Sequence, residues 1–393
     1  MTQDAIVIVA ARRTPIGAFQ GALSPVSAPE LSAIASKACL ADSGIPAADI
    51  DEALIGCVLT AGLGQAPARQ AVLAAGLPDS VPTTTINKVC GSGMKAVHIG
   101  ADMIRAGSAS IVLAGGMESM SNAPYLLPKA RSGYRMGHQE VLDHMFYDGL
   151  QNPYDGQMMG IFGDATAKSC GFSRSEQDEF AIESVQRALA AAAAGAFAAE
   201  LAPVTVKDRK GETVITSDEE PGRCDLKRIP TMRAAFAKDG TVTAATSSSI
   251  SDGAASLLLM SESEAQRRGL KPLARIIGQA SHAQDPAWFT TAPGPAMKKL
   301  LAAINWKVAD VDLFEINEAF ACVTLAAMRD LGVQHARVNV HGGACALGHP
   351  IGATGARIIT TLIHALKSRG AKRGIATACI GGGEAVATAI EVL

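Results

Sequence analysis

Three reactive side chains of this sequence stand in glycine-rich stretches. Cys90 begins CGSG, His349 lies in GHPIGATG, and Cys379 begins CIGGG. A thiolate, an imidazole and a second thiol could supply a nucleophile, a base and a further acid or base. Glycines let backbone N–H groups approach a substrate closely, as an oxyanion hole requires. Together, the three stretches predict covalent catalysis by a cysteine nucleophile.

Cys90 stands where an apolar stretch leads into a helix-like run, in NKVCGSGMKAV at residues 87–97. Free backbone N–H groups and the positive end of a helix dipole favour the thiolate form there, so we expect a reactive thiol. Taken alone, such a cysteine is more often a small buried hydrophobe, and three glycines are more often a turn. The prediction therefore depends on the three residues together.

The elements that must position these residues alternate between strand-like and helix-like patterns, which is typical of α/β layers. Residues 43–56 and 304–317 share a helix end, a turn, an Asp-x-Asp and a strand. Each is followed by a glycine-flanked stretch that opens a helix, and then by a strand that ends in glycines and a glutamate. We therefore expect two similar halves whose strand–helix junctions converge on one region. The expected strands cover residues 5–9, 52–58, 109–116, 311–316 and 374–383, and the expected helices cover residues 30–43 and 355–368.

Residues 121–247 interrupt this pattern with methionines, prolines, glycines and many basic side chains. We interpret them as an insertion that covers one end of the first half. A strand at residues 256–260 is expected to return the chain to that half. The predicted domains are a first half of residues 1–120 and 248–270, an inserted loop domain of residues 121–247, and a second half of residues 271–393.

One helix is clear within the insertion, in SRSEQDEFAIESVQRALAAAAAG. Ser173 and Glu176 have the spacing of a capping box at its start. The expected packing face of this helix consists of Ile182, Val185 and Leu189.

The composition gives no sign of a nucleic-acid or membrane partner, and we expect neither. The 393 residues carry a net charge of −2, and no apolar run reaches the length that spans a membrane. Eight cysteines without a CxxC pair indicate reduced thiols in a cytoplasm rather than disulfides. No GxGxxG, GK[ST] or HExxH motif supports a nucleotide loop or a metal site, so we expect no metal. His138 and His144 flank a charged stretch and are expected on the surface.

Long motifs throughout the sequence resemble those of the thiolase family. They run from VIVAARRTPIGAF through NKVCGSGMKAV, VLAGGMESMSNAPY, INEAFA and GGACALGHPIGATGARI to CIGGGEA, and they cover essentially the whole chain. The resemblance implies a thiolase-like α/β fold with five layers, α/β/α/β/α, made of two similar halves and an inserted loop domain. It also implies acetyl-CoA C-acyltransferase activity by a ping-pong mechanism, in which coenzyme A cleaves a 3-ketoacyl-CoA or two acyl-CoA molecules condense.

The resemblance further implies a role for each site residue. Cys90 is the nucleophile that becomes acylated, and His349 is its base. Cys379 moves the α-proton of the second acyl-CoA, which the acylated Cys90 cannot do. Asn317 holds a water that stabilises the enolate oxygen together with His349. The N–H groups of Cys90 and Gly381 form a second oxyanion hole, and no cofactor is implied because the coenzyme A thioesters are substrates.

By the same resemblance, coenzyme A lies along the inserted domain. Its charged nucleotide end calls for basic residues, and Arg223 and Arg228 are expected there. Each of the two arginines is as often simply a solvated surface residue. The other expected contacts are Phe236, Ala244 and Ser248 along the pantetheine, and Met159 and Ala319 nearer the thioester.

Some positions differ from the short-chain biosynthetic pattern of this family. Met158 replaces a histidine, WFTTAPGPA replaces a more usual glycine- and proline-rich motif, and His341 replaces an asparagine. The preferred acyl chain and the working direction therefore stay open. The stretch at residues 126–145 resembles the family's tetramerisation loop, so we expect a homotetramer, with a dimer as the alternative.

Two other classes of function stay possible from the residues. A ketoacyl-synthase-like condensing enzyme would pair one cysteine with two histidines, or with a histidine and an asparagine, so Cys379 speaks against it. A non-catalytic acyl-CoA-binding relative would not need Cys90, His349, Asn317 and Cys379 together.

Overall fold

The computed structural model describes residues 4–208 and 211–393. Within these residues the strands form one large sheet and two small two-stranded sheets. The order across the large sheet is β12 (Leu313–Ile316), β13 (Arg373–Ile380), β14 (Glu384–Val392), β11 (Ala274–Ala283), β1 (Ile6–Arg13), β10 (Ser251–Ser261), β5 (Ile111–Ser119), β3 (Glu52–Gly56) and β4 (Thr83–Ile86), with the short β2 (Gly17–Ala18) beside β10.

The two halves of this sheet have the same strand pattern. In the first half, β3 is parallel to β4 and β5, and β10 is antiparallel to β5 and β1. In the second half, β12 is parallel to β13, and β14 is antiparallel to β13 and β11. The halves join where Ile6, Val7 and Ile8 of β1 pair with β11. The internal repeat predicted from the sequence is therefore confirmed.

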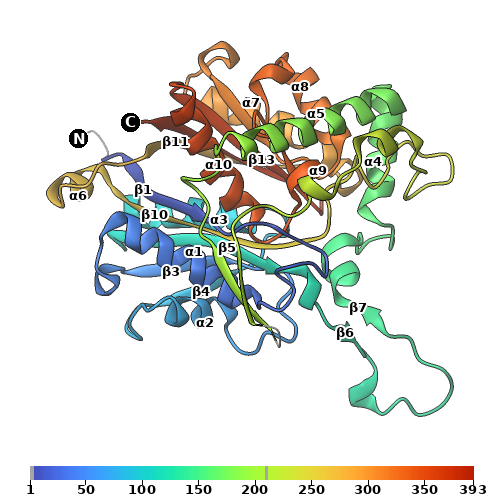
Figure 1. Cartoon of the computed structure of the whole chain (residues 1–393), viewed down its shortest axis with the longest axis horizontal. Coiled ribbons are helices and arrows are strands. Elements are labelled where there is room, and N and C mark those ends of the chain that lie inside the picture. Colours follow the sequence, from blue (N-terminus) through green and yellow to red (C-terminus); the bar gives the residue numbers. More distant parts are fainter. Residues whose placement is uncertain (1–3, 209–210) are drawn as a thin grey trace.

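Helices cover both halves and separate them, as Figure 1 shows. α1 (Ala28–Ser43) and α2 (Pro67–Ala74) pack on the outer face of the first half, and α7 (Pro293–Ala303) packs on the outer face of the second, with α8 (Ala321–Leu331) against it. Between the halves, α3 (Ser92–Ala106) and α10 (Thr354–Ser368) pack on each other and on strands. The five-layered α/β/α/β/α fold is therefore confirmed.

Glycines allow α3 and α10 to touch. A Cβ on Gly93 would lie 2.8 Å from the backbone nitrogen of Ala356, and one on Gly355 would collide with the backbone of Met94. Because both helices begin at this contact, the residues just before them are brought to one place. This is the convergence of junctions that the repeat predicted.

The insertion lies between β5 and β10, and β10 returns the chain to the first half as predicted. Its first part is a hairpin that projects at the lower right of Figure 1. The elements of the insertion are β6 (Tyr125–Leu126), β7 (Leu142–Asp143), α4 (Met159–Cys170), α5 (Arg174–Ala193), β8 (Val204–Asp208) and β9 (Gly211–Ile215), and the remaining short helices of the chain are α6 (Glu262–Arg267) and α9 (Ala344–Leu347).

The predicted helix of the insertion is α5, and its capping box is confirmed. The Ser173 hydroxyl accepts from the Glu176 N–H at 3.2 Å, and the Glu176 carboxylate accepts from the Ser173 N–H at 2.7 Å. The predicted packing face is only partly right. Val185 is buried, but Leu189 is 38% exposed, because α5 packs through a neighbouring stripe that includes Ala181 and Ala188.

The surface prediction for His144 was wrong. Its side chain is 5% exposed, with Nδ1 2.5 Å from a carboxylate oxygen of Asp148 and Nε2 accepting from the Ala61 N–H at 3.3 Å. These two partners lie on different segments and fasten the base of the hairpin to the first half. His138, near the tip of the hairpin, is exposed as predicted. None of the helices in the described residues is long and apolar enough to cross a membrane.

Candidate active site

A tight turn between β4 and α3 carries Cys90. Val89 has a φ of +45°, which is left-handed, and Ser92 stabilises the turn through its hydroxyl. That hydroxyl accepts from the Lys88 N–H at 2.8 Å and donates to the Val89 carbonyl at 2.7 Å. Gly91 is needed beside the cysteine, because a Cβ there would collide with Ile380 at the end of β13. The turn that carries Cys90 therefore packs closely against the second half of the molecule.

The structure overturns the expectation that Cys90 is a resting thiolate. Burial raises the pKa of Cys90 to about 11, although the N–H groups of Gly381 and of Cys90 itself counteract this rise. Cys90 packs beside Val58, Leu59 and Ile351, which the sequence did not place near it. Desolvation by these apolar neighbours outweighs the backbone donors and the helix end, so the resting group is a protonated thiol.

His349 is buried and held at both ring nitrogens. Its Nδ1 lies 2.6 Å from the hydroxyl of Thr354, which itself donates to the Pro350 carbonyl at 3.0 Å. The hydroxyl proton is thus used, so the hydroxyl accepts from Nδ1–H and leaves Nε2 unprotonated. Burial lowers the pKa of His349 to about 3, with a smaller effect of Arg357. The residue is therefore a neutral imidazole whose Nε2 can take a proton.

Asn317 lies next to this nitrogen. It follows β12, and its backbone N–H donates to the Thr377 carbonyl on β13 at 2.9 Å. Its side-chain nitrogen is 3.4 Å from His349 Nε2, and its Oδ1 is buried without a hydrogen-bond partner among the described residues. The structure thus brings Asn317 and His349 together, as the resemblance implied.

Cys379 and Gly381 lie at the end of β13. The turn that follows needs glycine, since Gly382 and Gly383 have φ values of +95° and +91°. Cys379 is fully buried, and burial, with Cys90 nearby, raises its pKa well above the ordinary value. A Cβ on Gly381 would lie 3.5 Å from the sulfur of Met159. Gly381 therefore lies between Cys90, whose sulfur its N–H faces, and the inserted domain.

An apolar cavity of about 350 Å³ opens beside these residues. Two apolar clusters contribute to its wall. The cluster that holds Cys90 supplies Leu150 and Ile250, and the cluster that holds Cys379 supplies Phe320. The full lining is Phe146, Leu150, Met158, Met159, Gly160, Ala235, Phe236, Ala244, Ser247, Ser248, Ser249, Ile250 and Phe320.

Most of the predicted coenzyme A contacts gather at this cavity. Met159, Phe236, Ala244 and Ser248 line it, and the Ala319 carbonyl accepts from the Ser248 N–H at 3.0 Å. A Cβ on Gly160 would collide with the Phe236 ring, so glycine lets this ring lie against the start of α4.

The two predicted arginines are not among the lining residues. Arg223 is exposed and forms an ion pair with Glu219 at 3.1 Å, and Arg228 is exposed on a short helical segment.

Sequence reasoning missed Thr354 and Glu118. Thr354 is five residues after His349, at the start of α10. A hydroxyl so close in sequence could have indicated the group that fixes the tautomer of His349. Glu118 accepts from the N–H groups of Val58, Leu59 and Gly352 at 2.9–3.1 Å, so it ties the loop beside Cys90 to the loop of His349. Burial raises the pKa of Glu118 to about 7 against these donors. Within the described residues, no group of three or more His, Cys, Asp or Glu could hold a metal ion.

Comparison with known proteins agrees with this geometry. The N-terminal domain of thiolase matches residues 6–263, and the C-terminal domain of thiolase matches residues 270–392. The acetyl-CoA acetyltransferase of Pseudomonas aeruginosa is 49% identical over 97% of this chain and 98% of its own length. The acetyl-CoA acetyltransferase of Escherichia coli is 49% identical over 98% and 99%.

A solved structure extends the likeness to three dimensions. The crystal structure of the Bacillus anthracis acetyl-CoA acetyltransferase superimposes with a TM-score of 0.97 at 41% sequence identity, and the match covers 100% of this chain and 99% of that chain. Both domain families, the relatives and the fold agree over the full length. The chain therefore belongs to the thiolase family.

Proposed function

We propose that this protein is an acetyl-CoA C-acyltransferase. In one direction coenzyme A cleaves a 3-ketoacyl-CoA, and in the other two acyl-CoA molecules condense. The observation that carries the proposal is the meeting of Cys90, His349, Asn317 and Cys379 beside one apolar cavity. The full-length relatives named acetyl-CoA acetyltransferase support the same reaction.

The first half-reaction places the acyl group on Cys90. As the sulfur attacks the thioester carbonyl carbon, the Cys90 proton passes to Nε2 of His349, and the N–H groups of Cys90 and Gly381 stabilise the oxyanion. The carbon–sulfur bond to coenzyme A then breaks, and the leaving sulfur takes a proton from Cys379. Because both thiols are protonated at rest, proton transfer accompanies bond formation rather than preceding it.

The second half-reaction uses the Cys379 thiolate that remains. Burial raises the pKa of Cys379, and this same burial makes its thiolate a strong base toward the α-proton of the next acetyl-CoA. The enolate oxygen is stabilised by the protonated His349 and by a water held on Asn317. Carbon–carbon bond formation expels the Cys90 thiolate, which takes back its proton from His349.

The test is direct. Purified protein is mixed with acetoacetyl-CoA, and the absorbance of the 3-ketoacyl thioester is followed with and without coenzyme A. We expect the absorbance to fall only when coenzyme A is added. A fall without coenzyme A would indicate hydrolysis, and no change in either case would favour a non-catalytic acyl-CoA-binding protein.

Ketoacyl-synthase chemistry is the alternative condensation. It would require release of CO₂ from a malonyl thioester, which thiolases do not need. The buried Cys379 beside Cys90 favours thiolase chemistry, because a decarboxylating enzyme generates its carbanion without removing an α-proton. Release of labelled CO₂ from malonyl-CoA would reverse this choice.

Arg223 and Arg228 are proposed to bind the nucleotide end of coenzyme A. Both are exposed on short helical segments of the inserted domain and carry the positive charge that phosphates bind. Replacing either by alanine should raise KM more than it lowers kcat, because the contact with the nucleotide is equally strong in the ground state and in the transition state. A pantetheine thioester, which lacks the nucleotide, should be indifferent to both changes.

The substrate chain length and the physiological direction also belong to this proposal. We propose short 3-ketoacyl-CoA substrates with a role in fatty acid metabolism, including β-oxidation. The full-length relatives named acetyl-CoA acetyltransferase support acyl chains of a few carbons. A series of 3-ketoacyl-CoA substrates of increasing length would measure the preference.

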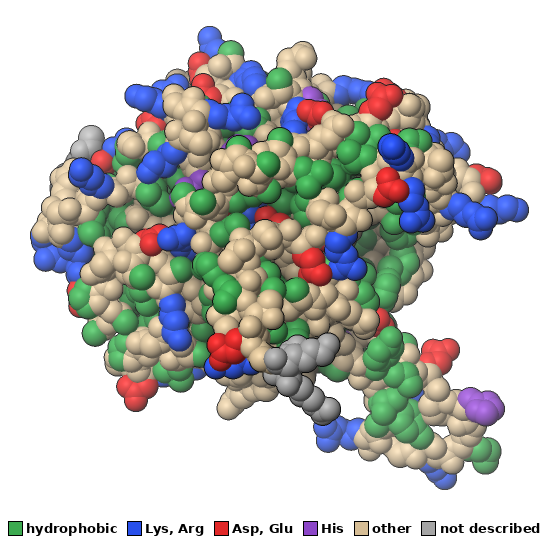
Figure 2. Space-filling model, viewed as in Figure 1, with side chains coloured by type: hydrophobic (Ala, Val, Ile, Leu, Met, Phe, Trp, Pro, Cys, Tyr) green, Lys and Arg blue, Asp and Glu red, His purple; other side chains and the backbone are tan. Residues whose placement is uncertain are grey.

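We further propose a cytoplasmic homotetramer with the domain limits predicted above. All eight cysteines are free thiols, which suits a reducing compartment. Figure 2 shows hydrophobic side chains on the projecting hairpin. The exposed apolar residues of the hairpin and of the helical turn that follows it are Tyr125, Leu127, Met136, Val141 and Tyr147. Such a patch is typical of a subunit contact. Light scattering of the protein with and without Met136→Asp would test the assembly.

A further inference from the structure

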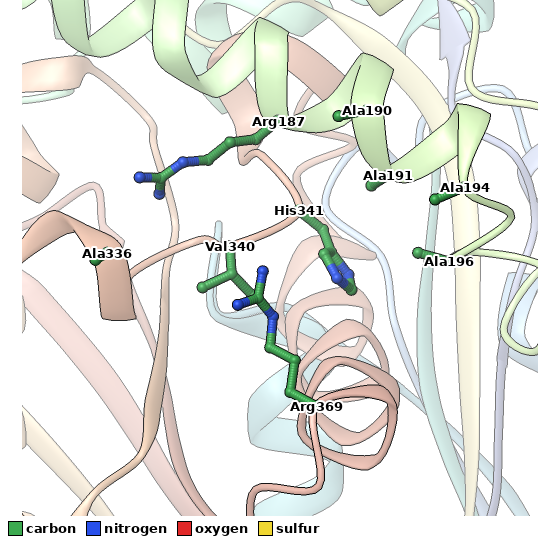
Figure 3. A pocket seen from close by; sticks show the side chains of 9 residues that line it. All are labelled: Arg187, Ala190, Ala191, Ala194, Ala196, Ala336, Val340, His341 and Arg369. Atoms are coloured by element: carbon green, nitrogen blue, oxygen red, sulfur yellow. The ribbon is translucent and has the colours of Figure 1, made fainter.

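A second cavity, of about 480 Å³, lies where the end of α5 approaches the end of α10. None of the residues proposed to act in catalysis or to bind coenzyme A lines it. Figure 3 shows the alanines of α5 along one side and Arg369, from the end of α10, on another. Its lining residues are Arg187, Ala190, Ala191, Ala194, Ala196, Ala336, Val340, His341 and Arg369.

The lining contains two guanidinium groups and no carboxylate. The guanidinium of Arg187 already has partners within the protein. Its Nε pairs with Glu183 at 2.7 Å, and its Nη1 donates to the carbonyls of His335 and Val338. Arg369 is different. Arg369 is exposed at the end of α10, and within the described residues its guanidinium has no carboxylate within ion-pair distance and makes no hydrogen bond. It is a cation that a ligand could pair.

His341 provides the second polar group. It is only 7% exposed, and its ring packs edge-on against Phe197 at 5.8 Å. Neither ring nitrogen has a hydrogen-bond partner in the part of the chain that the structure describes. Burial lowers the pKa of His341, Glu200 acts against this shift and the nearby Arg369 adds to it.

Two acidic residues near the cavity lining, Glu200 beside His341 and Glu183 beside Arg187, are already paired. Glu200 forms a buried ion pair with Arg13 at 2.5 Å, and Glu183 pairs with Arg187. Neither is therefore available to neutralise Arg369. The ring nitrogens of His341 keep some exposure at the cavity wall, so a ligand with acceptor oxygens can replace water as their hydrogen-bond partner.

We propose that this cavity binds a small organic anion, with its oxyanion group between Arg369 and His341. The guanidinium presents paired N–H donors that match the oxygens of a carboxylate or a phosphate ester. The apolar part of the ligand lies on the alanine face of α5, formed by Ala190, Ala191 and Ala194. The volume is in the range of small-molecule sites, on the order of 300–1,000 Å³.

Calorimetric titration tests this site with simple probes. Butyl phosphate and butyrate are each titrated into the full-length protein at constant ionic strength, with butanol as the uncharged control. We expect saturable binding of at least one anion and none of butanol. The anion that binds more tightly identifies the ligand as a phosphate ester or a carboxylate.

Variants assign the binding to this cavity. Arg369→Gln and His341→Ala should each weaken binding of that anion by about tenfold or more, because each removes a donor. Lys367→Gln is the matched control, since Lys367 is exposed at the end of the same helix and does not line the cavity. It should bind as the unchanged protein does, and all three variants should retain the acyl-transfer rate.

Three results would overturn the proposal. They are no saturable binding by the unchanged protein up to about 10 mM of either anion, equal binding by Arg369→Gln and the unchanged protein, and an equal loss in Lys367→Gln and Arg369→Gln. The last result would assign the binding to general surface charge rather than to the cavity.

Discussion

The two halves of this molecule have the same strand order, except that β4 has no counterpart in the second half, and each half places a loop before a central helix, yet the two loops carry different reactive residues. In the first half the chain passes from β4 into α3, and Cys90 stands two residues before the helix. In the second half α9 intervenes, and His349 stands five residues before α10. The first junction thus carries the proposed nucleophile, and the second carries the proposed base.

The ends of the equivalent strands differ in the same way. In the first half, Glu118 lies near the end of β5. Its carboxylate accepts hydrogen bonds from three backbone N–H groups and so holds two loops together. Near the end of β13 the second half has Cys379, a buried thiol without such a role. The repeat thus places equivalent positions at the centre, while both residues proposed to move protons, His349 and Cys379, come from the second half.

Removing the nucleophile should have the largest effect. Cys90→Ala takes away the only group placed to hold the acyl unit, so acyl transfer should fall to the background rate, while melting temperature stays close to that of the unchanged protein. Thiolysis of acetoacetyl-CoA measures the loss. Residual turnover above a few per cent would show that the first half is not the carrier.

Removing the base should cost less. His349→Ala should slow thiolysis by on the order of 10²–10⁴-fold, which is the usual contribution of a general base to the rate. The pH profile separates this role from a structural one. With pKa values of about 3 for His349 and about 11 for Cys90, the unchanged protein should show no ionisation of either group between about pH 4 and 10.

In His349→Ala the reaction depends on the small thiolate fraction of Cys90. That fraction, and hence the rate, should rise about tenfold per pH unit toward pH 11, since deprotonation exposes the nucleophile that His349 otherwise generates. A variant whose rate is flat with pH, or within threefold of the unchanged protein, would exclude His349 as the base.

Cys379→Ser should separate the two half-reactions. Attack of Cys90 on the first thioester still has its base and its oxyanion donors, so acetyl-enzyme should form, more slowly because the serine hydroxyl is a poorer proton donor to the leaving sulfur. Carbon–carbon bond formation should fail. The serine hydroxyl is too weak an acid to form an alkoxide near neutral pH, so no base is present to remove the α-proton. Exchange of deuterium into the methyl group of acetyl-CoA reports the step directly, and exchange at the unchanged rate would contradict the role of Cys379.

Thr354→Val should have the smallest effect of the series. It removes the hydroxyl that accepts from Nδ1 of His349 and so releases the ring, at a cost of up to about 10²-fold in kcat. Thr354→Ser should restore most of the rate. Thr360→Val is the matched control, since the Thr360 hydroxyl is buried in the same helix and donates only to the Ala356 carbonyl. Equal losses in both valine variants would indicate a packing effect.

The sequence was sufficient to predict the architecture and to single out the candidate site residues. Cys90, His349 and Cys379 stood out because neighbouring glycines mark sharp turns, and those turns depend on local sequence. The repeat was visible for the same reason, because the strands, turns and helices of each half are each formed by contiguous residues.

What the sequence could not provide depends on contacts between distant segments. Burial raises the pKa of Cys90, and the apolar cluster against which it packs includes Val58, Leu59 and Ile351, which come from two loops far apart in the chain. His144 looked like a surface residue because its partners, Ala61 and Asp148, are not recognisable as such from its neighbours. Local patterns give element types and turns, whereas burial and its electrostatic effects require the folded chain.

The central claim is that the first half carries the acyl group and the second half moves the protons. Mass spectrometry of the protein after brief exposure to acetyl-CoA tests it most directly. We predict one added acetyl group, located on the peptide that contains Cys90, both in the unchanged protein and in Cys379→Ser. Acetyl on the Cys379 peptide, or none on Cys90, would contradict this division of work between the two halves.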